Sequence, residues 1–244
     1  MRLFFFLIMF FILGFKNSPA QTVDISDVNS DTTVADTESI DVYDKFNSIL
    51  GGDSVRWKEK GVKLTGSYEE YYSNGKLKHK GFYTNGQLST IYKNYFDNGQ
   101  LERSFKMIDS RNFQMELYYK SGVMKSKRKY FKGKEITEED YYPNGKMEYF
   151  EENDKSFEFY ITMNYYYKNG SPQSSLQLVD KKNKMYDSKE YWPNGNVKEE
   201  GKMFFNKVLN DYLKNGTWIL YDDSGKKIAE EDYVKGQVNE ERKF

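Results

Sequence analysis

The chain has 244 residues, of which 30% are charged and 18% aromatic, with 22 Tyr, 4 Pro and no Cys. It is too polar for a membrane-embedded helical bundle and too rich in aromatic residues for a disordered protein. The absence of cysteine excludes disulfides, and the balance of 37 basic and 37 acidic residues gives no electrostatic reason to expect nucleic acid as a partner.

Residues 1–20 have the pattern of a secretory signal peptide. Arg2 precedes an apolar run over residues 3–13 that is too short to span a bilayer as a helix. Small residues at Ser18 and Ala20 stand three and one positions before a predicted cleavage site at Gln21, and an uncleaved anchor helix is the alternative. Cleavage would leave 35 basic and 37 acidic residues. We therefore expect a secreted or periplasmic protein without stable membrane insertion.

Residues 21–52 are predicted to be an acidic disordered linker followed by a short helix. Seven acidic residues and no Lys or Arg lie between Thr22 and Asp44, and such a segment has little to bury. The apolar residues of positions 42–50 then follow a helical spacing that ends at Gly51-Gly52.

Residues 53–244 contain about seven copies of a tyrosine-rich unit centred on a turn glycine. Tyr71-Tyr72-Ser73-Asn74-Gly75 is the first copy, and Tyr141-Tyr142-Pro143-Asn144-Gly145 is the fourth. Successive turn glycines are separated by 24, 23, 23, 25, 25 and 30 residues, and this regular period indicates a tandem repeat. The predicted structural turn glycines are Gly75, Gly99, Gly122, Gly145, Gly170, Gly195 and Gly225.

Each unit reads as strand, turn, strand, turn. In the first unit Leu77 and Tyr83 follow the glycine by two and eight residues, and even offsets place side chains on one face of a strand. A second turn follows at Asn85-Gly86. Tight hairpin turns need positive φ, which glycine adopts freely and asparagine tolerates. The predicted fold is all-β: an elongated single-layer antiparallel meander of about fourteen strands.

The pattern of two aromatic residues, any residue, Asn, Gly, any residue and an aliphatic residue resembles the MORN repeat, in the bacterial variant of YwqK-type antitoxins. The last unit, residues 216–236, is the closest match, and the resemblance covers roughly residues 54–244. It implies hairpins stacked into a meander whose repeats serve as protein-interaction and scaffolding elements, and in some relatives as lipid contacts.

Candidate chemistry is sparse, so we expect neither an enzyme nor a cofactor. His79 is the only histidine, so a catalytic triad has one possible base and a histidine metal cluster has no second member. His79 is predicted to occupy an ordinary strand position in the first repeat. The acid pairs Glu69-Glu70, Glu138-Glu139 and Glu230-Glu231 recur in register with the repeats and are predicted to face solvent instead of serving as a glycosidase's carboxyl pair.

A basic cluster over residues 125–134 could contact an anionic lipid or polymer. Acidic residues follow at once over residues 135–140, which favours cross-strand charge pairing.

In the first six units a tyrosine stands four residues before the turn glycine, and these six form the candidate binding strip: Tyr71, Tyr95, Tyr118, Tyr141, Tyr166 and Tyr191. The strip is either the packed face of the sheet or a surface that binds a partner. The sequence favours an exported, non-enzymatic scaffold with a protein partner of unknown identity or a cell-envelope partner. The alternatives are an antitoxin or immunity protein that docks on a toxin and, more remotely, a protein that binds anionic lipid or polysaccharide.

Overall fold

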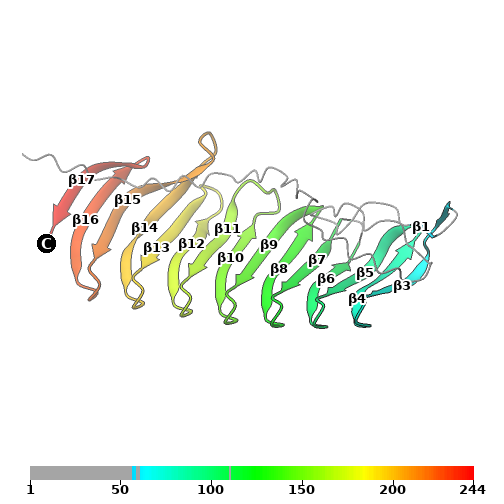
Figure 1. Ribbon diagram of the computed structural model, residues 1–244. Coiled ribbons are helices and arrows are strands. Elements are labelled where there is room, and N and C mark those ends of the chain that lie inside the picture. Colours follow the sequence, from blue (N-terminus) through cyan, green and yellow to red (C-terminus); the bar gives the residue numbers. More distant parts are fainter. Residues whose placement is uncertain (1–56, 59–60, 110) are drawn as a thin grey trace, which may run out of the picture. The chain divides into compact units, whose positions relative to one another are not determined.

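The computed structural model describes residues 57–58, 61–109 and 111–244, and these confirm the all-β antiparallel meander. A short pair, β1 (Trp57–Lys58) and β2 (Val62–Lys63), precedes a fifteen-stranded sheet in which each strand is antiparallel to the next in sequence (Figure 1). The predicted signal peptide, acidic linker and short helix lie outside the described residues. Among the described residues, no helix is long and apolar enough to cross a membrane.

The strands of the large sheet are β3 (Gly66–Tyr71), β4 (Leu77–Thr84), β5 (Gln87–Tyr95), β6 (Leu101–Met107), β7 (Phe113–Tyr118), β8 (Met124–Phe131), β9 (Lys134–Tyr141), β10 (Met147–Asn153), β11 (Tyr160–Tyr166), β12 (Pro172–Asp180), β13 (Met185–Tyr191), β14 (Val197–Asn206), β15 (Asp211–Tyr221), β16 (Lys227–Val234) and β17 (Gln237–Lys243).

The seven turn glycines lie in the hairpin turns at one end of the strands, the lower side in Figure 1, and all have positive φ. In the fourth repeat Gly145 has a φ of 80°, and its N–H donates to the carbonyl of Tyr142 at 2.8 Å. This is a three-residue hairpin loop that ends on a left-handed glycine. The expectation that asparagine also supplies positive φ here is wrong, because Asn144 is not left-handed. Its side chain instead accepts from the N–H of Lys146 at 3.0 Å and donates to the Lys168 carbonyl in the next turn at 2.8 Å.

The second turns lie at the opposite ends of the strands, and in the three that are two residues long the expectation of positive φ holds for both residues. Asn85 and Gly86 have φ of 56° and 81°, and Lys132 and Gly133 have φ of 52° and 76°. These are two-residue hairpin turns, whose backbone twist matches that of the flanking strands.

Every glycine-turn hairpin contains one extra residue in its second strand. In the fourth repeat Tyr141 pairs with Met147 while Asp140 pairs with Tyr149, so Glu148 has no partner in the ladder between β9 and β10. Such a bulge re-aims the side chain of the extra residue. The bulge residue is the third after the glycine in all seven repeats: Lys78, Glu102, Lys125, Glu148, Gln173, Lys198 and Ile228.

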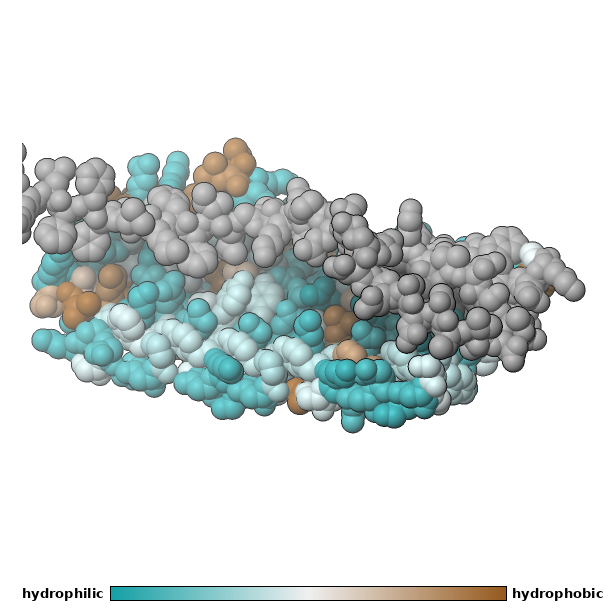
Figure 2. All heavy atoms as spheres, in the orientation of Figure 1, coloured by the Kyte–Doolittle hydropathy of each residue, from teal (hydrophilic) through white to brown (hydrophobic). Residues whose placement is uncertain are grey.

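The buried core lies on one face of the sheet. Tyr92, Phe105 and Met115 are cross-strand neighbours and join Phe113 and Tyr130 in one cluster. A second cluster gathers Phe159, Leu176, Tyr186 and Phe205. The surface in the view of Figure 2 is mostly hydrophilic, with an apolar tip on the loop between β14 and β15, where Val208 is 94% exposed.

His79 is not the ordinary strand position that the sequence suggested. It is fully buried, its Nδ1 lies 2.9 Å from Asn94 Oδ1, and its Nε2 lies 2.9 Å from the Tyr83 hydroxyl. The physical reason is its even offset from Gly75, which places it on the core face with Tyr83.

The opposite face carries the predicted cross-strand charge pairs. Lys80 and Glu69 are 2.6 Å apart, and Lys189 and Glu200 are 2.7 Å apart. In the basic cluster Lys127 lies 4.0 Å from Glu139 on the neighbouring strand.

The expectation that paired acids face solvent is wrong for Glu138 and Glu139, whose side chains are only 17% and 18% exposed. Adjacent strand residues point to opposite faces, so one member of each pair must lie on the core side. Glu138 is that member, and its carboxyl group lies against the Arg128 guanidinium.

Candidate binding site

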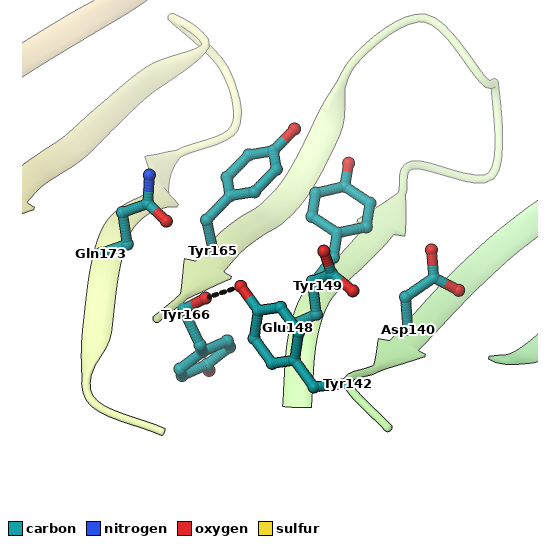
Figure 3. Close-up of a pocket in the computed structure, with 7 residues that line it drawn as sticks. All are labelled: Asp140, Tyr142, Glu148, Tyr149, Tyr165, Tyr166 and Gln173. Atoms are coloured by element: carbon teal, nitrogen blue, oxygen red, sulfur yellow. Dashed lines mark hydrogen bonds between the residues drawn. The ribbon is translucent and has the colours of Figure 1, made fainter. Parts of the chain in front are cut away.

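A pocket of about 340 Å³ opens beside the glycine turns of the fourth and fifth repeats. Four adjacent strands, β9 to β12, and the turn after β9 supply its lining (Figure 3). The lining residues are Asp140, Tyr142, Glu148, Tyr149, Tyr165, Tyr166 and Gln173.

Strand register brings the central residues of the pocket together. Tyr149 on β10 is directly opposite Asp140 on one side and Tyr165 on the other, so the three form a row across three strands. The rings of Tyr149 and Tyr165 have centroids 4.6 Å apart. Glu148 and Gln173 are both bulge residues, so the bulges add one polar side chain from each of two repeats.

Tyr142 and Tyr166 close the turn side of the pocket. The Tyr142 hydroxyl donates to the Tyr166 carbonyl at 2.8 Å, while the Tyr166 ring lies away from the rings of Tyr149 and Tyr165 (Figure 3). The pocket therefore uses the backbone of Tyr166 and the ring of Tyr142.

The pocket is acidic and aromatic. Its lining holds two carboxyl side chains, Asp140 and Glu148, and no basic one. Burial and the nearby Glu148 raise the pKa of the Tyr142 hydroxyl, and burial together with a hydrogen bond to Glu151 raises the pKa of Tyr149. Both hydroxyls consequently stay protonated at neutral pH.

The six tyrosines of the candidate binding strip lie in a different environment. Tyr71 is 57% exposed, and the other five are half-buried. The hydroxyls of Tyr71, Tyr118 and Tyr141 each donate to the glutamate two residues earlier, on the charged face of the sheet. None of the six belongs to either buried cluster among the described residues, so the strip is not the packed face.

Of the residues that line this pocket, only Tyr166 belongs to the candidate binding strip predicted from the sequence. The other six were not predicted as site residues: Asp140, Tyr142, Glu148, Tyr149, Tyr165 and Gln173. The sequence does carry one indication of the pocket. The third residue after the turn glycine varies between repeats and is lysine, glutamate, glutamine or isoleucine.

Three carboxyl groups, those of Glu135, Glu138 and Glu151, offer oxygens within 4.8 Å of one another near the pocket. The Arg128 guanidinium pairs with two of them, at 3.8 Å from Glu135 and closer to Glu138. Because a protein cation already occupies this cluster, we assign no metal to it.

Four segments of the chain match the family model of the MORN repeat variant: residues 64–85, 134–149, 187–206 and 214–235. The second of these segments contains Asp140, Tyr142, Glu148 and Tyr149. No curated protein matches the sequence.

Solved structures show only partial likeness. A point mutant of S. aureus TarM, in complex with Fondaparinux, alpha-GlcNAc-glycerol and UDP, is 13% identical over 52% of this chain and 22% of that one, with a TM-score of 0.28. The TcdB2-TccC3-Cdc42 structure is 10% identical over 75% of this chain and 14% of that one, with a TM-score of 0.20. The chain thus spans less than a quarter of either protein's length, and likeness at these TM-scores carries no argument.

Proposed function

Because the chain is a MORN-repeat protein, we propose that it is an exported, non-enzymatic scaffold that binds a protein partner. Such repeats are generally associated with the binding of proteins or of membrane lipids. The observation that carries this proposal is the pocket of the fourth and fifth repeats. Three of its seven lining residues, Tyr142, Tyr149 and Tyr165, contribute tyrosine rings, a side chain that concentrates binding energy in protein interfaces.

Charge favours a protein partner over an anionic lipid. A phosphate headgroup needs free basic side chains, whereas the pocket presents Asp140 and Glu148. In the basic cluster, two of the six basic residues, Lys127 and Arg128, lie against acids on the neighbouring strand.

Binding is also favoured over catalysis. The single histidine, His79, is buried against Tyr83 of β4 and Asn94 of β5 and does not line the pocket. A general acid or base must be able to reach its substrate.

The place of action follows from the sequence of residues 1–20. An apolar run followed by a small-residue cleavage pattern supports export to the periplasm or the medium. The partner would then be a protein of the cell envelope or of the surroundings, and docking on a toxin would be one form of such binding.

The direct test is capture of a partner from the envelope fraction of the producing cell with the mature chain. We expect one protein to be retained by the folded chain and lost when the chain is denatured first. The double variant Tyr118→Ser with Tyr141→Ser should keep that partner, because the hydroxyls of both residues face the charged side of the sheet. Binding of the mature chain to anionic vesicles without capture of any protein would contradict the proposal.

A further inference from the structure

Three repeats place their own cation over an aromatic ring. The bulge residue is lysine in these repeats, and its ammonium lies over the second aromatic residue of the same unit. Lys78 lies 5.7 Å from the centre of the Tyr72 ring, Lys125 lies 5.8 Å from that of Tyr119, and Lys198 lies 5.6 Å from that of Trp192. A cation within about 6 Å of a ring centre is attracted by the π-electrons.

The sixth repeat shows the complete arrangement. Lys198 Nζ lies over Trp192 and also 3.0 Å from Oε2 of Glu190, the residue just before the first aromatic of the unit. One ammonium thus neutralises an acid and covers a ring at the same time.

The fourth repeat has the same ring and the same acid without the cation. Tyr142 stands where Trp192 does, Asp140 stands where Glu190 does, and Glu148 replaces the lysine. Among the described residues, no lysine or arginine pairs with Asp140 or Glu148, and none lies over the Tyr142 ring. Two carboxyl groups and a ring therefore face a space that three other repeats fill with their own ammonium (Figure 3).

We propose that this pocket binds the cationic side chain of a lysine or arginine presented by the protein partner. The inference rests on the proposed function and names the chemistry of the partner at that site. In the fourth repeat the incoming cation occupies the position that the Lys198 ammonium has in the sixth repeat. It lies against the Tyr142 ring and donates charge-assisted hydrogen bonds to Asp140 and Glu148. The side chain of Gln173 adds an amide oxygen as a further acceptor.

The test uses two peptides and two variants of the mature chain. The first peptide alternates Gly and Arg, and the second has neutral citrulline in place of each Arg. Glu148→Lys should fill the pocket from within, as Lys198 does in the sixth repeat. Glu102→Lys is the matched control, because Glu102 is the half-buried bulge residue of the second repeat and the charge change is the same.

We expect the Arg peptide to bind the parent chain at least about tenfold more tightly than the citrulline peptide, measured by calorimetry at low salt. Glu148→Lys should weaken the Arg peptide by at least about tenfold, and Glu102→Lys by less than about twofold. Thermal unfolding of both variants should follow that of the parent. Glu148→Gln, which removes the charge without filling the space, should give an intermediate affinity and covers the case in which Glu148→Lys does not fold.

Equal weakening by Glu148→Lys and Glu102→Lys would overturn the inference, because it would show a diffuse charge effect. So would equal affinity for the two peptides, or binding of a neutral oligosaccharide in place of the Arg peptide. Partner capture separates the two proposals. If the Arg peptide binds as expected but no protein is captured, the scaffold function fails and the pocket chemistry stands. If Glu148→Lys captures the partner as well as the parent does, the pocket chemistry fails and the scaffold function stands.

Discussion

The hydroxyl of Tyr142 donates a hydrogen bond of 2.8 Å to the carbonyl of Tyr166, one repeat further along the chain. Tyr119 makes the same bond to Tyr141 at 2.8 Å, and Tyr167 makes it to Tyr191 at 2.8 Å. The second aromatic residue of a unit therefore ties its turn to the next turn, and the first aromatic supplies the acceptor. This bond accounts for a tyrosine at the second aromatic position; the acceptor is a main-chain carbonyl and does not depend on the side chain of the first aromatic residue.

Replacing Tyr142 by Phe should remove that bond and leave the ring in place. We expect the free energy of unfolding to fall by about 0.5–1.5 kcal/mol, as measured by urea titration. Phe96 occupies the same position in the second repeat, so phenylalanine fits there. Binding of the Arg peptide should change little, and an unaltered unfolding midpoint would show that the inter-repeat bond contributes nothing.

Gly201 lies so close to Trp218 that a methyl group cannot be added without moving the indole. A Cβ at position 201 would come within 2.5 Å of the Trp218 ring, which is 1% exposed. We expect Gly201→Ala to cost about 1–3 kcal/mol through overpacking and to shift the tryptophan fluorescence. Gly145→Ala is the control: its Cβ would approach no atom closer than 3.7 Å, so it should cost about 1–2 kcal/mol through its positive φ alone and leave the emission unchanged.

His79→Gln should be clearly destabilising, in contrast to what its position in the sequence suggested. The substitution disturbs the hydrogen bonds to Asn94 and Tyr83 in a fully buried place, and we expect a loss of about 1–3 kcal/mol in urea unfolding. Lys80→Gln on the adjacent exposed position is the comparison, because its exposed ion pair with Glu69 is screened by solvent and should contribute little to stability. Equal effects of the two substitutions would contradict the role of His79 in the core.

Glu138 should make stability depend on pH. Burial, reinforced by a hydrogen bond with Glu135, raises the pKa of Glu138 from 4.5 to about 8, although Arg128 acts in the opposite direction. Between these values the folded state holds a proton that the unfolded state releases, so stability should fall as the pH rises from about 4.5 to 8. Glu138→Gln should flatten this decline in urea midpoints measured across that range. An unchanged slope in the variant would show that another group is responsible.

Export should be visible in the mass of the protein isolated from the producing cell. We expect an intact mass that corresponds to a chain beginning at Gln21, with or without cyclisation of that glutamine. A full-length species retained in the cytoplasm as the main product would contradict the proposed localisation.

The sequence by itself determined the repeat, its period and the all-β meander. Aromatic pairs and turn glycines recurring every 23 to 30 residues specify local hairpins, and a local hairpin needs no knowledge of distant contacts. The alternation of side chains also placed Tyr83 on one face of its strand, where it is buried.

Only the tertiary structure decided which residues form the pocket, because its lining depends on strand register and on bulges. One unpaired residue per hairpin aims Glu148 and Gln173, and register aligns Asp140, Tyr149 and Tyr165 across three strands. The even offset of His79 from its turn glycine places it on the core face, whereas its hydrogen-bond partner Asn94 comes from the neighbouring strand β5 and is decided by the register between β4 and β5.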